Sequence, residues 1–205
     1  MRTDVEQSYW RVYARIAGVD EVGRGCLAGA VVAAAVVFEH GFEPKGILTK
    51  VNDSKQLTPD LRKELAEAIK ASAKCYAIAE VSPSEIDSLN IFNATMRAMN
   101  CAIEQLSPPP DFLLIDGNRF KPTLPIAFET VVKGDSKVFS IAAASILAKV
   151  HRDTLMKLLD SAYPQYGFAN HVGYATREHI AAIKRYGRCA IHRQSFKLKA
   201  LGEKA

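Results

Sequence analysis

The stretch AGAVVAAAVVF, residues 28–38, constrains the fold of this chain more than any other. It contains small, β-branched and aromatic residues without a charge, which is typical of a strand buried on both faces of a sheet. It is well short of the roughly 20 apolar residues that a membrane-spanning helix needs, so we expect no membrane partner. The stretch RIAGVD, residues 15–20, also indicates a strand, and we expect the two to form a hairpin-like start of a sheet.

Helix and strand patterns alternate along the rest of the chain. Thr58 and Pro59 have the residue types of a helix N-cap and first helical position. A helical stripe of methionine, isoleucine and leucine follows the third strand, and we interpret it as core rather than as a cofactor site. That stripe consists of Met96, Met99, Ile103 and Leu106. Further strands are expected at 75–81, 111–116 and 125–132, and a long alanine-rich helix is expected from about Ser136 to about Asp160.

This order of elements predicts an α/β fold, a mixed sheet flanked by helices with antiparallel pairing at its start. We expect a single domain over residues 1–205, with an α/β core to about residue 160. Residues 161–205 are expected to form a C-terminal loop and helical appendage. Its Tyr- and Gly-rich loop leads into a helix near 176–186.

The composition is that of an ordinary globular protein with enough length for a core, since 48% of the 205 residues are hydrophobic and 24% charged. The formal net charge of +5 favours a polyanionic partner without proving one. Four scattered cysteines without a C-x-x-C pair predict reduced thiols and a cytoplasmic protein. The mixed charges of residues 1–18 are unlike a secretory signal. A monomer is the default expectation.

Acidic residues stand at the ends of predicted strands or in the next turn. Asp20 and Glu21 end the first strand, Asp116 ends LLID, and Asp135 lies in VVKGDSK. Ligands bind at such edges of α/β sheets, so acids from separate segments could share one site. Neighbouring carboxylates repel one another unless a cation compensates, and two divalent ions could then support phosphodiester hydrolysis. A single aspartate at a strand end is more often a turn former or helix cap.

Adjacent side chains in a strand point to opposite faces, so Asp20 and Glu21 could both be ligands only if the chain left strand geometry there. We expect the glycines that follow to allow this. The turn Gly23-Arg24-Gly25, called the GRG turn below, could bring backbone N–H groups and an arginine fork to a phosphate or sugar. Lys55, in NDSK, is a candidate phosphate contact, with a solvated loop lysine as the alternative.

Together these motifs resemble the bacterial ribonuclease HII family, or type 2 ribonuclease H. The resemblance runs in order through GVDEVGRGCLAGAVV, NDSKQL, LNIFNATMRAM, LLIDGN, VVKGDSK, AAASILAKVHRD, YPQYGFANHVGYAT and IHRQSF. It implies a ribonuclease H-like fold and metal-dependent cleavage of RNA in RNA–DNA hybrids. It also implies nicking on the 5′ side of single ribonucleotides in duplex DNA, which leaves 3′-hydroxyl and 5′-phosphate ends and serves ribonucleotide removal.

The resemblance also implies roles for individual residues. The acids Asp20, Glu21, Asp116 and Asp135 are similar to the family's four ligands for Mg²⁺ or Mn²⁺. The GRG turn, Gly23, Arg24 and Gly25, is similar to the turn that reads the ribose 2′-hydroxyl. Tyr174 is similar to the tyrosine that stacks on the deoxyribose after the ribonucleotide, although Tyr163 or Tyr166 could take that place.

The sequence departs from the usual family pattern at three positions. Cys26 replaces a common proline, Ala142 a serine, and Val172 a lysine, whose loss could remove one phosphate contact. Lys149 and Arg177 are candidates to compensate. His151 and His192 could be general acids or phosphate contacts, but a helix histidine is more often a surface or packing residue.

Two other hypotheses belong to different classes. One is a non-catalytic nucleic-acid-binding protein with the same fold, against which the four acids argue, because without a metal they would only repel phosphates. The other is a ribonuclease H-like nuclease or recombinase that acts on DNA alone, against which the GRG turn and Tyr174 argue.

Overall fold

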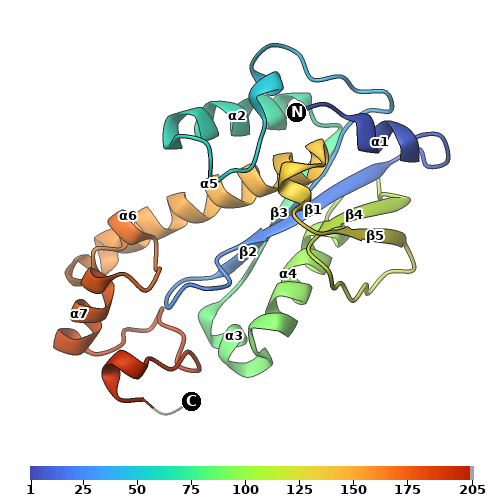
Figure 1. The fold of residues 1–205 in the computed structure, drawn as a ribbon. Helices are drawn as coiled ribbons and strands as arrows, with labels where there is room; N and C mark the ends of the chain where they lie inside the picture. Colours follow the sequence, from blue (N-terminus) through green and yellow to red (C-terminus); the bar gives the residue numbers. More distant parts are fainter. Residues whose placement is uncertain (204–205) are drawn as a thin grey trace.

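The computed structural model describes residues 1–203, and its centre is a five-stranded mixed sheet (Figure 1). The strands are β1 (Ile16–Val22), β2 (Val31–Val37), β3 (Cys75–Val81), β4 (Phe112–Asp116) and β5 (Ala127–Val131). They lie in the order β3-β2-β1-β4-β5. The first three pair antiparallel, whereas β1–β4 and β4–β5 pair parallel. The predicted fold class and the hairpin-like start of the sheet are therefore confirmed.

Helices cover both faces of the sheet. The α-helices are α1 (Asp4–Tyr9), α2 (Pro59–Ser72), α3 (Pro83–Leu89), α4 (Ile91–Glu104), α5 (Phe139–Ala162), α6 (Phe168–His171) and α7 (Arg177–Tyr186). Short 3₁₀ helices are η1 (Gly46–Lys50), η2 (Gly134–Ser136), η3 (Pro164–Tyr166) and η4 (Lys199–Leu201). None of the helices within residues 1–203 has both the length and the apolar character that membrane crossing requires.

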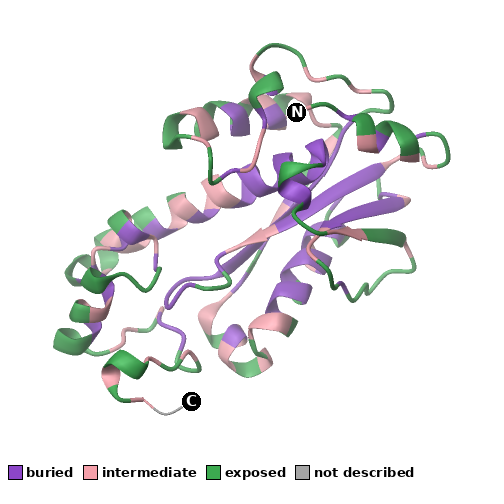
Figure 2. Cartoon of the chain, viewed as in Figure 1, coloured by how far each residue is buried: buried purple, intermediate pink, exposed green. Residues whose placement is uncertain are grey.

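Alternation along the strands divides the core into two layers (Figure 2). Odd-numbered residues of β1 and β2, such as Val19 and Ala33, pack with Met96 and Met99 of α4 on one face. Even-numbered residues of β2, such as Val32, face α2 and α5. The methionine stripe is therefore core, as predicted. Helix α5 lies very close to β1, since a Cβ at Gly18 would approach the Ser140 carbonyl carbon to 2.2 Å.

The long helix begins later than predicted, at Phe139 rather than near Ser136. The reason is that residues 134–136 form η2, in which the Gly134 amide donates to Asp116 Oδ1 at 2.7 Å. A tertiary contact with the end of β4 thus replaces the first helical turn. Helix α2, in contrast, begins as predicted, with Thr58 as N-cap and Pro59 as first residue.

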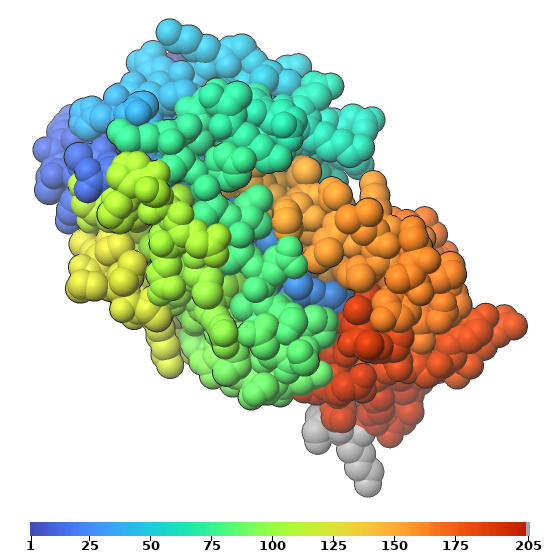
Figure 3. Space-filling model, turned by 180° about the vertical axis from the view of Figure 1, so that it is seen from behind, coloured from blue at the N-terminus to red at the C-terminus, as the bar shows by residue number. Residues whose placement is uncertain are grey.

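The C-terminal segment packs on the end of α5 that lies away from the sheet (Figure 1). An apolar cluster joins Met156 of α5 to Phe168, to Ile183 of α7, and to the loop residues Leu27 and Ala28. Seen from behind, the segment also lies beside α3 (Figure 3), where Asp87 accepts hydrogen bonds from the Gln194 and Ser195 amides, each at 2.8 Å. The last segment of the chain is therefore tied to the loop after β1.

Candidate active site

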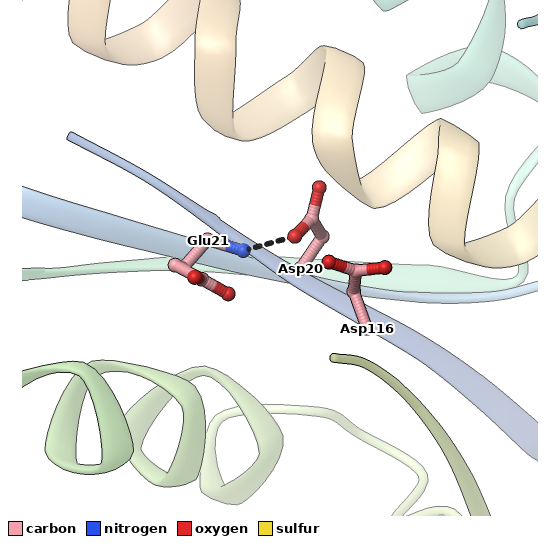
Figure 4. A group of neighbouring side chains, drawn as sticks. All are labelled: Asp20, Glu21 and Asp116. Carbon is pink, nitrogen blue, oxygen red and sulfur yellow. Dashed lines mark hydrogen bonds between the residues drawn. The ribbon is translucent and has the colours of Figure 1, made fainter. Parts of the chain in front are cut away.

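Strand β1 carries two acids without any interruption of its geometry. Asp20 and Glu21 stay in register with Ala34 and Ala33 of β2, so the prediction that the chain leaves strand geometry here is wrong. Their side chains do point to opposite faces of the sheet. The two carboxylates nevertheless lie close together at the end of β4. The reason is that the pairing of β1 with β4 ends at Val19, the residue before Asp20. Asp20 points to the same side as Asp116, the last residue of β4, and the Glu21 carboxylate lies close to both from the other side of β1 (Figure 4).

These three carboxylates form one cluster. Asp20, Glu21 and Asp116 each contribute an oxygen, and the three oxygens lie within 4.8 Å of one another. Two backbone amides orient the group, because the Glu21 amide donates to Asp20 Oδ1 at 2.7 Å and the Gly134 amide holds Asp116. The Arg24 guanidinium pairs with Glu21 at 3.1 Å from the solvent side. Asp20, only 5% exposed, is the most enclosed of the three.

The cluster holds more negative charge than its surroundings neutralise. Burial raises the pKa of Asp20 well above its usual value, and the charges of Glu21 and Asp116 raise it further, against an opposing hydrogen bond from Ser145. Burial also raises the pKa of Glu21, despite Arg24, and the pKa of Asp116, despite the Gly134 amide. Like charges this close in a desolvated place favour a bound cation or protonation.

Asp135 lies beside this cluster rather than inside the group of three. It is buried in η2, and its charge and its backbone amide both act on the pKa of Asp116. Lys55 Nζ approaches Asp135 Oδ2 at 3.5 Å, while most of the lysine side chain stays exposed. The four acids predicted from the sequence therefore meet at one edge of the sheet, three in close contact and the fourth adjacent.

The acids open into a cavity of about 410 Å³. Of the residues singled out from the sequence, Lys55 and Tyr174 also line it. Lys149, a candidate to compensate for the missing lysine at position 172, lines it too, as do Ser54, Arg62 and Ser145, which had no predicted role. The Ser145 hydroxyl lies 3.0 Å from the Ser54 hydroxyl and acts to lower the pKa of Asp20 against the effect of burial. The spacing of Ser145 and Lys149, four residues apart in a predicted helix, was the signal that could have placed both on one face.

The GRG turn begins one residue after β1. Gly23 has φ of +93°, and a Cβ there would lie 2.3 Å from Arg152 Nε, so only glycine fits. A Cβ at Gly25, in contrast, would meet nothing within 4 Å. The space beside Gly25 is open to a ligand. Cys26 is fully buried behind the turn, where burial raises the pKa of its thiol and the Tyr174 hydroxyl opposes that shift.

Tyr174 is the tyrosine that the structure places at the cavity. The residue is 40% exposed, and Lys149 Nζ lies 5.9 Å from its ring centroid. Tyr166 is buried and stacked on Phe168, and Tyr163 packs edge-on against the same ring. Neither of these two lines the cavity.

The structure shows the surroundings of the positions that depart from the family pattern and of His151 and His192. Ala142 is buried in the α5 layer of the core, and the Val172 carbonyl accepts from Arg152 at 2.8 Å. Lys149, rather than Arg177, lines the cavity. His151 pairs with Glu80 on the surface, and His192 is buried against His179, so both follow the surface or packing interpretation.

The donor set suits a hard divalent cation. The cluster offers carboxylate oxygens alone, without a thiolate or imidazole, which is the ligand chemistry of Mg²⁺, Ca²⁺ and Mn²⁺. Burial, followed by the charges of Glu21 and Asp116, raises the pKa of Asp20, and a bound cation would stabilise the ionised carboxylate against both. The residues present therefore fit a metal of this class.

Comparison with known proteins agrees with this geometry. Residues 17–199 match the family model "Ribonuclease HII". A ribonuclease HII of Chloroherpeton thalassium is 64% identical over 199 residues, which cover 97% of this chain and 98% of that protein. A ribonuclease HII of Chlorobaculum tepidum is 59% identical, with 100% of both chains covered. The crystal structure of ribonuclease H2 from Pyrococcus horikoshii superposes with a TM-score of 0.74 at 26% identity, over 92% of this chain and 95% of that one.

Proposed function

Because this chain belongs to the ribonuclease HII family, whose members are ribonuclease H nucleases, we propose that it nicks duplex DNA on the 5′ side of single embedded ribonucleotides as well as cleaving the RNA strand of RNA–DNA hybrids. The products are 3′-hydroxyl and 5′-phosphate ends, and the role is ribonucleotide removal in the cytoplasm by a monomer. One observation carries the proposal: the carboxylate cluster and Tyr174 line one cavity, and Arg24 of the GRG turn lines a second cavity that shares Glu21 and Asp116 with it.

The acids are proposed to hold Mg²⁺ or Mn²⁺. Asp20, Glu21 and Asp116 would be the central ligands, and Asp135 would complete a two-ion site. When bound, such ions activate water and stabilise the leaving oxygen in phosphodiester hydrolysis. The Glu21 amide orients Asp20, and the Gly134 amide orients Asp116, so that both carboxylates are held before substrate arrives.

The other residues of the cavity are proposed to position the nucleic acid. Lys55 and Lys149 stand on the cavity wall as point charges suited to phosphates. The amides of the GRG turn would contact the ribose 2′-hydroxyl, the one group that distinguishes RNA from DNA at a given site. The Tyr174 ring would stack on the following deoxyribose and so test for a 2′-deoxy neighbour.

Three duplexes of equal sequence test the proposal. They are all-DNA, DNA with one ribonucleotide, and an RNA–DNA hybrid, each incubated with Mg²⁺ and with chelator. We expect Mg²⁺-dependent cleavage of the second and third only, with the nick on the 5′ side of the single ribonucleotide. No metal-dependent cut would support a non-catalytic binding protein, and a cut in all-DNA would support a DNA nuclease.

A further inference from the structure

A second buried arginine, Arg193, lies directly behind the GRG turn although it is 170 residues away in the sequence. It follows α7 in the tail, whose residues 191–193 run antiparallel to the loop 27–29. The Gly29 amide donates to the Ile191 carbonyl at 2.9 Å, and the Arg193 amide donates to the Leu27 carbonyl at 2.9 Å. These bonds bring the guanidinium into the interior, where it is fully buried.

The guanidinium of Arg193 donates only to backbone carbonyls. Nη2 donates to Gly23 O at 2.7 Å and to Gly29 O at 2.9 Å, Nη1 to Arg24 O at 2.9 Å, and Nε to Gly29 O at 3.1 Å. Within residues 1–203 no carboxylate forms an ion pair with it. Burial lowers the pKa of Arg193 to about 10, which leaves the group charged at neutral pH. The buried charge of Arg193 therefore serves to donate hydrogen bonds to the carbonyls of Gly23, Arg24 and Gly29.

Those contacts determine which way the peptide groups of the GRG turn face. In a trans peptide the carbonyl and the following N–H point in opposite directions. Because Arg193 draws the carbonyls of Gly23 and Arg24 inward, the next two amides, those of Arg24 and Gly25, are directed outward. Two successive outward amides form a concave donor site for an oxygen. The open space beside Gly25 lies where such an oxygen could enter.

On this basis we propose that Arg193 is a positioning residue, which fixes the GRG turn so that the Arg24 and Gly25 amides face the ribose 2′-hydroxyl. The proposal rests on the proposed function and adds a specificity role for the C-terminal tail. Lysine cannot take this role, because its three donors sit on one atom, whereas the planar guanidinium spans three carbonyls at once.

The test uses Arg193→Lys in the full-length protein and measures a ratio of affinities. Fluorescence anisotropy, with Ca²⁺ in place of Mg²⁺ and intact substrate verified on a gel, gives the dissociation constants for a single-ribonucleotide duplex and for the matching all-DNA duplex. We expect the preference for the ribonucleotide to fall by about five- to tenfold, as for one or two lost hydrogen bonds. Affinity for all-DNA and for Mn²⁺ should be little changed, because Arg193 contacts neither the carboxylates nor the cavity wall.

This ratio separates positioning from a merely structural role. A variant with a smaller folded fraction loses apparent affinity for both duplexes equally, so the ratio of the two dissociation constants stays the same. The matched control is Arg188→Lys, which removes bonds from another guanidinium to the Arg193 and Phe196 carbonyls without touching the GRG turn. It should keep the wild-type ratio. If circular dichroism shows that Arg193→Lys is unfolded, Arg193→Gln, which keeps amide donors, replaces it.

Three outcomes would overturn the proposal. The first is an unchanged ratio in folded Arg193→Lys, and the second is an equal fall in Arg188→Lys, which would attribute the effect to a loosened tail. The third is that the wild-type protein binds the single-ribonucleotide duplex and the all-DNA duplex equally well. That result would also contradict recognition of the 2′-hydroxyl, and so it would show that the proposed function itself is wrong.

Discussion

Two buried polar clusters of opposite character lie on either side of the GRG turn. The acidic cluster at the end of β4 has like charges packed together, and burial and mutual repulsion raise the pKa of Asp20. The C-terminal cluster contains two buried arginines and three buried histidines, in which each side-chain nitrogen has a hydrogen-bond partner. These residues are Arg152, Arg193, His171, His179 and His192.

The histidines show how complete that second network is. The Cys189 amide donates to His192 Nδ1 at 2.9 Å, so His192 carries its proton on Nε2 and donates it to His179 Nε2 at 3.0 Å. His179 then donates from Nδ1 to the Tyr174 carbonyl at 2.9 Å. Both imidazole rings can therefore make all of these hydrogen bonds in their neutral form. The comparison teaches that buried like charges that repel one another mark a place for a ligand, whereas a cluster in which every side-chain nitrogen, including those of the two arginines, has a hydrogen-bond partner marks a scaffold.

Asp116→Asn attacks the acidic cluster directly and should have the largest effect. The amide keeps the shape of the side chain but loses its charge. Loss of an outer-shell partner of a metal ligand already costs about 10–100-fold, so we expect Mg²⁺-dependent cleavage of a single-ribonucleotide duplex to fall at least about a hundredfold. Urea unfolding of the metal-free variant at pH 7 should show no loss of stability, because a like charge has been removed beside Asp20.

The control for this prediction is Asp111→Asn, just before β4 and outside the cavity, where the carboxylate accepts from the Arg15 amide. Its cleavage rate should stay at the wild-type level. Near-normal turnover by Asp116→Asn would contradict the site.

Low pH should destabilise the C-terminal cluster, because His179 and His192 are buried in their neutral form. Burial, opposed by the hydrogen bond to the Tyr174 carbonyl, lowers the pKa of His179 to about 4, and burial with the His179 charge lowers the pKa of His192 to about 4. A group with a lowered folded-state pKa takes up its proton more readily when unfolded. The stability is therefore fully present above pH 6.5 and is lost as the pH falls from 6.5 towards 4, by on the order of 3 kcal/mol for each of the two histidines.

Urea unfolding of wild type, His179→Gln and His151→Gln between pH 7.5 and 4.5 measures this loss. We expect His179→Gln to show a shallower fall in the free energy of unfolding, whereas His151→Gln, on the surface, should follow wild type. His171, stacked on His179, and Arg188 also act on the pair, and both are unchanged in these variants. Parallel curves for wild type and His179→Gln would refute the prediction.

Tyr174 stands where the two clusters meet, and its ring should matter more than its hydroxyl. Loss of an aromatic stacking partner for nucleic acid costs about 1–3 kcal/mol, so we expect Tyr174→Ala to lower kcat/KM for a single-ribonucleotide duplex about tenfold. Tyr174→Phe keeps the ring and should retain most activity. Tyr186→Ala, an exposed tyrosine outside the cavity, is the matched control. Equal losses in Tyr174→Ala and Tyr174→Phe would show that the hydroxyl carries the effect.

The smallest effect concerns the backbone of the C-terminal segment. Val172 has φ of +44°, which is strained for a β-branched residue, and Arg152 holds its carbonyl there. Both Val172→Gly and Val172→Ala remove the side chain contacts, but only glycine adopts this conformation freely. We expect the glycine variant to be more stable than the alanine variant by about 1 kcal/mol in urea unfolding. Equal stabilities would contradict the strain.

Local sequence patterns predicted most of the fold. The buried strands, the Thr58 helix start and the methionine stripe depend on short-range periodicity and capping, and each is present in the structure. The start of α5 was predicted too early, because the Gly134 contact with Asp116 belongs to another strand. The expected break after Asp20 was wrong for a similar reason, since the end of β4 cannot be located from β1 alone.

The four acids, the GRG turn and Lys55 were candidates from short motifs in the sequence, whereas Tyr174 was a candidate only through the family resemblance, with Tyr163 and Tyr166 as alternatives. Ser145 and Arg193 were not assigned a role. Their partners, Asp20 and the carbonyls of the GRG turn, are separated from them by more than a hundred residues, and no local pattern encodes such a pairing.

The sequence by itself determined the chemical groups of this protein and their local geometry: carboxylates at strand ends, a glycine turn after the first strand, and an aromatic residue in a C-terminal loop. Only the tertiary structure decided that β1 extends beyond its pairing with β4, so that acids from opposite faces of β1 lie close together. It also decided that a buried arginine of the C-terminal tail orients the GRG turn. Residue type and short-range periodicity act along the chain, whereas burial, repulsion between carboxylates and hydrogen bonds to distant carbonyls arise only after the sheet and the tail have packed.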